Sequence, residues 1–401
     1  MVTSLFMKSL HFCFAVLCSF LALIVPVNAQ TWTQTAAPLN TWYALATSAD
    51  GSKLVAAGGG SSAGGIFISQ NSGLTWTPTT APTTNWFAVA SSADGVKLVA
   101  VAGGGFTPVK GLIYTSSNSG ATWTPTTAPS DYYYTVASSA DGTRLLAAGS
   151  RNRPTAIYSS TNSGVTWTSN NLAPMLWRSL VVSPDGSKVA ALAGGGNGGI
   201  FTSVNFGETW LYNAAPSTLF STLAASADTT RLVGVSAPGL IYTSTNFGVT
   251  WIQTPAPNGF WSSAAASADG SRLVTVGSIG DIYTSTDSGT TWISNSAPVT
   301  NWSSVALSAD GGKLVAAVNG GGIYTLQDTP PPMLNLKSED GTLALSWLTP
   351  SLNYTLHYCT NLASLVWDNV PVTPTLNFTN MRYEMILPAS ADRGYYRLSA
   401  P

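Results

Sequence analysis

The sequence is poor in charge: only 8% of its 401 residues are Asp, Glu, Lys or Arg, and the formal net charge is −1. A nucleic-acid-binding protein needs a basic surface to neutralise phosphates, and 16 Lys and Arg residues spread along the chain do not form one. We therefore expect no nucleic-acid partner. The apolar content of 45% argues equally against a disordered chain, because disorder goes with few apolar residues and high net charge.

Cysteine and histidine are also scarce, with three and two copies. Cys13 and Cys18 lie in an apolar N-terminal run, which leaves Cys359 alone, so no internal disulfide is expected and Cys359 is interpreted as a buried small side chain. His11 and His357 are too few and too far apart for a metal site or a nucleophile–base pair. We expect no metal and no cofactor.

Residues 1–29 have the pattern of a secretory signal. Lys8 supplies the positive charge, an apolar run follows from Leu10 to Val27, and Val27-Asn28-Ala29 resembles a cleavage site. The alternative is a retained membrane anchor. The cleavage pattern favours removal, so the sequence predicts an exported protein (extracellular, periplasmic or at the cell surface) with no stable membrane insertion afterwards.

One eight-residue phrase, Ser-x-Asn/Asp-x-Gly-x-Thr-Trp, occurs six times. Its copies end at Trp76, Trp123, Trp167, Trp210, Trp251 and Trp292. Each copy follows an Ile-aromatic pair, which predicts a tight turn between two strands, with the glycine at positive φ and the Asn or Asp bonded to turn amides.

A second motif precedes each phrase: an aromatic residue, a short run, and a Ser-Ala-Asp-Gly-type turn. Its aspartates are Asp50, Asp94, Asp141, Asp185, Asp228, Asp269 and Asp310, spaced 41 to 47 residues apart. With about four strands in each unit, this period predicts a β-propeller over residues 30–328. Trp32 stands ten residues before Trp42, the interval that separates each octapeptide Trp from the next strand aromatic. The N-terminal strand is therefore predicted to complete the last of seven blades and close the ring.

The octapeptide resembles the Asp-box, or BNR repeat, of β-propellers such as sialidases, sortilin-type receptors and photosystem II assembly factors. That resemblance implies a fold rather than an activity, because these boxes are turns in enzymes and non-enzymes alike. Five of the six copies carry Asn, and only Asp287 is a carboxylate, which favours a structural turn over a metal or catalytic site.

After the propeller, residues 329–332 form a Pro-rich linker and residues 333–401 lose the repeat. Short alternating runs there predict a small β-sandwich. Leu345-Ser346-Trp347 and the ending Gly394–Leu398 resemble fibronectin-type-III-like terminal modules of secreted bacterial proteins. The predicted fold class is all-β: a seven-bladed propeller closed by its N-terminal strand, plus a C-terminal sandwich.

Resemblance to sialidases implies an arginine triad, a Tyr/Glu pair and an acid Asp, and these do not carry over. Arg144, Arg231 and Arg272 occupy a repeat position that is Lys in other units, which leaves Arg151, Arg153 and Arg178. Acids outside the repeated turns are few and scattered: Asp131, Glu208, Asp281 and Asp328. No facing carboxylate pair of the glycosidase type is predicted, although the sequence leaves one open.

Aromatic residues gather at the starts of the first strands, near one entrance of the predicted ring. The first aromatic of each set recurs and is interpreted as packing between blades. Its non-repeating neighbours form the candidate ligand-binding set: Tyr43, Phe87, Tyr132, Tyr134, Arg178 and Phe260. The sequence thus predicts a secreted, non-enzymatic propeller that binds a protein or carbohydrate. The alternative is a glycoside hydrolase of sialidase or xyloglucanase type with a degenerate or unrecognised site.

Overall fold

The structure is a computed structural model. It describes residues 32–59, 64–103, 110–149, 153–195, 198–216, 220–280, 282–295, 297–298, 300–327, 334–339, 342–348, 355–359, 367–377, 382–388 and 395–399. The predicted signal at 1–29, the linker at 329–332, Arg151 and Asp281 lie outside the described residues. Every regular element in the described part is a β-strand. This part contains no helix with the length and hydrophobicity needed to cross a membrane.

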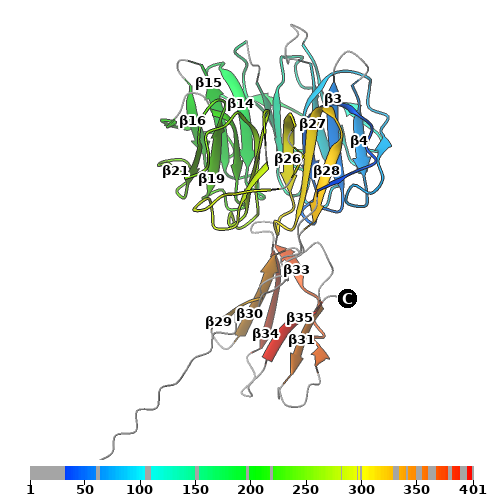
Figure 1. Ribbon diagram of the computed structural model, residues 1–401, viewed down its shortest axis with the longest axis vertical. Helices are drawn as coiled ribbons and strands as arrows, with labels where there is room; N and C mark the ends of the chain where they lie inside the picture. The colour runs from blue at the N-terminus through cyan, green and yellow to red at the C-terminus, as the bar shows by residue number, and fades with distance from the viewer. Residues whose placement is uncertain are drawn as a thin grey trace, which may run out of the picture. The chain divides into compact units, whose positions relative to one another are not determined.

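Four-stranded antiparallel sheets, called blades below, repeat along the chain (Figure 1). The first comprises β2 (Asn40–Thr47), β3 (Leu54–Gly59), β4 (Ile66–Ser69) and β5 (Thr77–Pro78). The next comprises β6 (Trp86–Ser91), β7 (Leu98–Ala102), β8 (Ile113–Ser116) and β9 (Thr124–Pro125). The one after it comprises β10 (Thr135–Ser138), β11 (Leu145–Ala148), β12 (Tyr158–Ser160) and β13 (Thr168–Ser169).

The pattern continues without a change of order. The following blade comprises β14 (Leu176–Val182), β15 (Val189–Gly194), β16 (Gly199–Ser203) and β17 (Leu211–Asn213). Then come β18 (Phe220–Ala225), β19 (Leu232–Ser236), β20 (Ile241–Ser244) and β21 (Ile252–Gln253). Next are β22 (Trp261–Ala266), β23 (Leu273–Gly277), β24 (Ile282–Ser285) and β25 (Ile293–Ser294). The last blade contains β26 (Trp302–Leu307), β27 (Lys313–Gly321) and β28 (Ile323–Gln327).

The N-terminal strand completes the last blade. β1 (Thr33–Gln34) pairs antiparallel with β28, with Thr33 opposite Thr325 and Gln34 opposite Tyr324. Two further pairs between β2 and β27 join the first and last blades into one sheet of eight strands. The first strands contact one another in the order β2, β6, β10, β14, β18, β22, β26 and back to β2, which is the circular arrangement of a β-propeller.

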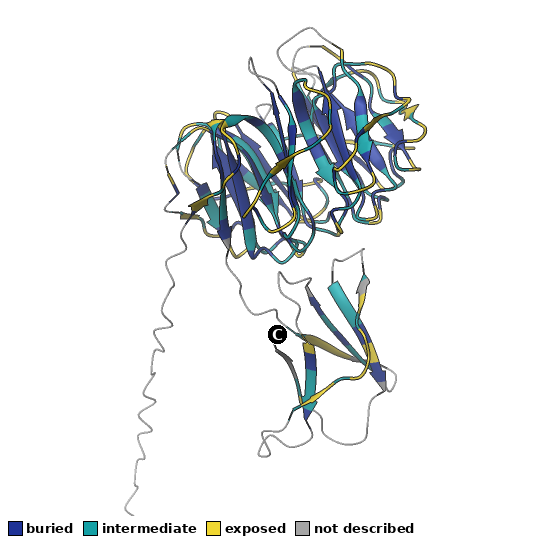
Figure 2. Cartoon of the chain, turned by 90° about the vertical axis from the view of Figure 1, so that its right-hand side faces the viewer, coloured by how far each residue is buried: buried dark blue, intermediate teal, exposed yellow. Residues whose placement is uncertain are grey.

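The hydrophobic core of the propeller is divided into clusters that each span two neighbouring blades. Figure 2 shows the buried segments of the strands. Trp86 of β6, for example, is fully buried against Val55, Ala57 and Ile66 of the preceding blade. The equivalent aromatics Trp42, Tyr133, Trp177, Phe220, Trp261 and Trp302 lie in the other clusters. The interpretation of this recurring aromatic as an inter-blade residue is confirmed.

The octapeptide turns have the hydrogen bonds expected of them. In the second copy, Ser116 Oγ accepts from the Gly120 amide at 2.9 Å, and Asn118 Oδ1 accepts from the Thr122 amide at 2.9 Å. Gly120 has φ 86°, as predicted. The residue before the glycine is also left-handed, at φ 54° for Ser119, which the sequence pattern did not predict because serine rarely adopts this conformation.

The C-terminal part has two sheets. One comprises β29 (Asn335–Glu339), β30 (Thr342–Leu348), β34 (Arg382–Pro388) and β33 (Thr375–Asn377). The other comprises β32 (Asp368–Asn369), β31 (Thr355–Cys359) and β35 (Tyr395–Ser399). Leu345 and Trp347 from the first sheet and Leu356 from the second share one buried cluster. Cys359 is buried and free, as interpreted from the sequence.

Trp32 should be essential to the closure of the ring. It is 9% exposed and packs against Trp302 with ring centroids 6.0 Å apart. We expect Trp32→Ala to lower the free energy of unfolding by about 3–5 kcal/mol, because it leaves a large cavity in a core cluster. Urea unfolding followed by Trp fluorescence measures this. Leu39→Ala, at a residue 72% exposed, is the matched control and should change little. An unchanged melting temperature after deletion of residues 30–38 would refute the closure.

We expect Thr275 to be less stabilising than the residue that most other blades have at the same position. It is fully buried in β23, and its hydroxyl has no hydrogen-bond partner among the described residues, whereas Ala56, Ala100 and Ala316 occupy the equivalent position. We expect Thr275→Val to raise the free energy of unfolding by about 1 kcal/mol, because it keeps the shape and removes a buried hydroxyl without a partner. Thr202→Val is the contrast: Thr202 Oγ1 accepts from Asn213 Nδ2 at 2.9 Å, so that variant should lose stability.

Candidate functional site

The candidate residues at the starts of the first strands lie on β-bulges. The register of pairing shifts between Trp42 and Ala44, between Trp86 and Ala88, and between Trp177 and Ser179. Tyr43, Phe87 and Arg178 are therefore the extra residues of their strands. A bulge redirects the side chain of its extra residue and releases it from the ladder of pairs. Tyr134 stands directly before β10, and its amide donates to the Ala148 carbonyl at 3.0 Å.

Three of the candidates form an aromatic ladder, Tyr43–Phe87–Tyr134, across three consecutive blades. The rings of Tyr43 and Phe87 are stacked, with centroids 5.2 Å apart and planes at 21°. The rings of Phe87 and Tyr134 are 6.4 Å apart at 34°. Phe87 is 8% exposed, so the two tyrosines, which are half-buried, supply most of the ladder's accessible surface. The structure thus brings these three residues together.

Arg178 is tied to the following blade. Its Nη1 donates to the Phe220 carbonyl at 2.9 Å. Gly194 makes room for the guanidinium, because a Cβ at that position would lie 2.2 Å from Arg178 Nε. Two serines at the same bulge position bond in the same way: Ser221 Oγ donates to the Trp261 carbonyl at 2.8 Å, and Ser262 Oγ donates to the Trp302 carbonyl at 2.6 Å. At these five positions the bulge residue therefore links neighbouring blades, by stacking or by hydrogen bonding. Ser303 is the exception, because its Oγ donates to the Ala317 carbonyl of its own blade.

A second set of links joins the blades at the opposite ends of the first strands. The amide of one turn residue donates to the carbonyl of the equivalent residue in the next blade, at 2.7–2.8 Å: Ala49 to Ala93, Ala93 to Ala140, Ala140 to Pro184, Ala227 to Ala268, Ala268 to Ala309 and Ala309 to Ala49. Pro184 has no amide hydrogen, so this link is missing between the blade of β14 and the blade of β18. Arg178 bridges that same pair of blades, which gives its charge a structural role.

Two cations lie near the ring of Tyr132. Arg153 Cζ is 5.0 Å from the centre of its ring, and Lys110 Nζ is 5.8 Å from it. The neighbouring Asp131 pairs with Gly111 through two backbone hydrogen bonds and accepts from the Tyr158 hydroxyl at 3.2 Å. The sequence pattern missed Lys110 because only the pairing of two distant loops places it beside Tyr132.

We call the end of the propeller at which the first strands begin the rim. Phe260 lies at a different part of this rim from the ladder. It precedes β22, whose first-strand neighbours are β18 and β26, and it is 47% exposed. The six candidates are thus divided into a contiguous ladder (Tyr43, Phe87, Tyr134), a cation-flanked tyrosine (Tyr132), a bridging arginine (Arg178) and an exposed phenylalanine (Phe260).

Of the four acids considered in the sequence, the structure describes two, and these lie at separate places. Glu208 lies in an octapeptide turn, where its amide donates to the Asn205 carbonyl. Asp131 is engaged by Tyr158, and Asp281 and Asp328 lie outside the described residues. Among the described residues, no three His, Cys, Asp or Glu side chains are grouped so as to hold a metal ion. Arg231 and Arg272 each bond to the next blade's turns, at Ser288 Oγ and the Gly311 carbonyl.

The pKa values of five turn aspartates are lowered. Burial raises the pKa of Asp141, but hydrogen bonds from Ser139 and Thr143, with Lys97 nearby, outweigh it and keep this pKa below its ordinary value of 3.8. Asp50, Asp185, Asp228 and Asp269 are shifted downwards for the same reasons. In the octapeptide turns, hydrogen bonds from the Thr291 hydroxyl and amide and from Ser285 lower the pKa of Asp287 to about 2.

These pKa shifts predict acid lability. A carboxyl whose pKa is lower in the folded state stabilises the fold above its unfolded value, near 3.8, and loses that contribution as the pH falls through the folded value. We expect the melting temperature to decline below about pH 4, by about 2–4 °C for each kcal/mol lost. Asp141→Asn should cost stability at neutral pH and much less in strong acid. An equal cost at both would contradict this account.

Comparison with known proteins supports the fold. The sequence matches no protein-family model and no curated protein. The structure of YCF48 from Cyanidioschyzon merolae matches with a TM-score of 0.57 at 14% identity, over 74% of this chain and 98% of that chain. The structure described as YCF48 bound to D1 peptide matches with a TM-score of 0.58 at 18% identity, over 76% and 98%. At these identities the likeness shows a shared β-propeller fold.

Proposed function

We propose that this chain is a secreted, non-enzymatic propeller of seven blades that binds a protein partner at the rim carrying the aromatic ladder. The observation that carries the proposal is the contact of Tyr43, Phe87 and Tyr134 across three blades. Rings held by stacking lose little conformational entropy when a partner binds, and tyrosine offers apolar area together with a hydroxyl. One of the structural neighbours, a YCF48 propeller, is bound to a peptide, which favours a protein partner over a carbohydrate.

The other parts of the proposal rest on the sequence and on the order of the strands. Seven repeats of the turn aspartate, with β1 pairing β28, support the seven-bladed count. The buried cluster shared by the two C-terminal sheets supports a small β-sandwich. The charge, apolar run and cleavage pattern of residues 1–29 support export.

The chemistry of the rim supports binding rather than catalysis. The rim cations Lys110, Arg153 and Arg178 each contact a ring or a backbone carbonyl. Asp131, the acid beside Tyr132, accepts a hydrogen bond from a tyrosine. A glycosidase needs two carboxylates that face each other across the scissile bond, and the described rim residues do not supply them.

A phage-displayed peptide library screened on the full chain tests this proposal. We expect an enriched peptide whose affinity falls about tenfold or more in Tyr43→Ala and Tyr134→Ala, because tyrosine is a frequent hot-spot residue. Asn118→Ala is the control, because β8 ends at the opposite end of the blade from Phe87. It should lose about 1–2 kcal/mol of stability and leave binding intact.

Two results would overturn the proposal. One is peptide binding that survives both tyrosine substitutions while Asn118→Ala abolishes it, which would place the site on the opposite face. The other is robust turnover in a panel of glycosidase substrates that is lost when a single acid is replaced, which would restore the glycoside hydrolase alternative.

A further inference from the structure

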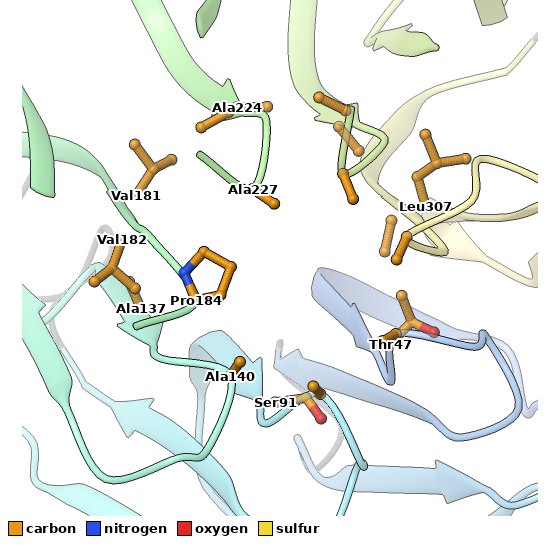
Figure 3. Close-up of a pocket in the computed structure, with 18 of the residues that line it drawn as sticks. Thr47, Ser91, Ala137, Ala140, Val181, Val182, Pro184, Ala224, Ala227 and Leu307 are labelled. Atoms are coloured by element: carbon orange, nitrogen blue, oxygen red, sulfur yellow. The ribbon is translucent and has the colours of Figure 1, made fainter. Parts of the chain in front are cut away.

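A cavity of about 390 Å³ lies at the ends of the first strands that are opposite the aromatic ladder. Figure 3 shows its lining residues, among them Thr47, Ser91, Val182 and Leu307. It is lined by the last residues of the first strands and by the turns that follow them. Its volume falls within the range of small-molecule sites, about 300–1,000 Å³. None of the residues that line it carries a charge. A charged ligand would therefore lose its hydration there without gaining a counter-charge.

The lining is divided into two arcs. The last residue of the first strand is Thr47, Ser91 and Ser138 in three consecutive blades. In the other four it is Val182, Ala225, Ala266 and Leu307. All of these residues are half-buried, as expected for side chains at the wall of an open cavity. One side of the cavity therefore carries hydroxyls and the other is aliphatic, and we call these two sets the hydroxyl arc and the aliphatic arc.

Each hydroxyl of the hydroxyl arc donates its hydrogen to a backbone carbonyl. Thr47 Oγ1 donates to the Ser48 carbonyl at 3.0 Å, Ser91 Oγ to the Ser92 carbonyl at 2.9 Å, and Ser138 Oγ to the Ser139 carbonyl at 3.0 Å. A hydroxyl has one hydrogen and two lone pairs, so each of these oxygens is left as an acceptor. The deeper Ser48, Ser92 and Ser226 donate to aspartates of their own turns.

The backbone of the cavity wall likewise offers hydrogen-bond acceptors rather than donors. The turn amides of Ala49, Ala93 and Ala140 are used in the links between blades, as are those of Ala227, Ala268 and Ala309. At the one missing link, Pro184 has no amide hydrogen to give to the Ala227 carbonyl, which adds another acceptor to the wall. A ligand that binds here must donate hydrogen bonds rather than accept them.

We propose that this cavity binds a neutral, mainly apolar small molecule that carries a hydroxyl or other uncharged donor on one side. The apolar body lies against Val182, Ala225, Ala266 and Leu307, and the donor faces the hydroxyl arc of Thr47, Ser91 and Ser138. This site is independent of the aromatic ladder, so either proposal can fail without the other.

Phenol and anisole are matched probes for this site, because they share the ring and only phenol has a donor. Binding to the full chain is measured by ligand-detected NMR, with benzoate as the charged control. We expect phenol to bind about three- to tenfold more tightly than anisole, the contribution of one net hydrogen bond, and benzoate to bind more weakly than either.

Substitutions test the contributions of the hydroxyl arc and the aliphatic arc separately. The triple variant Thr47→Val, Ser91→Ala and Ser138→Ala, which removes every hydroxyl of the hydroxyl arc, should reduce phenol to the affinity of anisole and leave anisole undiminished. Ser117→Ala, at an exposed octapeptide residue, is the control and should change neither. Ala225→Leu and Ala266→Leu should each weaken both probes by filling the aliphatic side.

Three outcomes would overturn the proposal. They are equal affinities for phenol and anisole, a phenol preference that survives the triple hydroxyl variant, and undiminished binding in an alanine-to-leucine variant whose melting temperature is unchanged. If one leucine variant fails to fold, the other and the triple hydroxyl variant still decide the question.

Discussion

Each blade depends on its neighbour, because a small twisted sheet cannot bury both of its faces alone. The aromatic residue at the start of each first strand meets that constraint by filling the space against the preceding blade. Trp42, Trp86, Trp177 and Trp302 are fully buried in this way. Since every core cluster of the propeller contains one first-strand aromatic, the core is a circle of interfaces, and Trp32 belongs to the interface between the blades of β22 and β26.

The bulge that follows the buried aromatic explains how a repetitive chain acquires individual features. The aromatic recurs in every blade because its volume fills a core. The next residue is not part of the ladder of strand pairs, so it can differ from blade to blade. That position holds Tyr43 and Phe87 where rings of neighbouring blades stack. It holds Arg178, Ser221 and Ser262 where side chains bond to the next blade's backbone. Arg178 has the longest reach among these links, and it serves the pair of blades in which Pro184 removes a turn bond.

The fold was largely predictable from the sequence because its determinants are periodic. The interval of ten residues that placed Trp32 beside the last blade required only counting, and the pairing of β1 with β28 agrees with it. The strands β32 and β33 were not predicted because segments of two or three residues carry no measurable periodicity. The left-handed Ser119 was also missed, because its conformation is imposed by the bonds around it rather than by its own preference.

The candidate site was predictable only in part, because contacts between blades depend on register. The positions of Tyr43, Phe87 and Tyr134 after or within the aromatic sets were visible in the sequence, but their mutual stacking follows from the bulges and from the spacing of the blades. Lys110 became a neighbour of Tyr132 only through the pairing of Gly111 with Asp131. A comparison of equivalent positions in the blades therefore finds which residues differ. The structure is needed to show what each of these residues contacts.

The two ends of the first strands differ in chemistry for a physical reason. The middle of each first strand packs against neighbouring blades, and it holds mostly small or aliphatic residues such as Val89 and Ala137. The two ends face open space, and there the side chains can vary with less effect on the core. At one end they are aromatic and cationic, and at the other they are hydroxylic on one arc and aliphatic on the other. The same constraint that makes the scaffold repetitive thus confines its chemical variety to two separate surfaces.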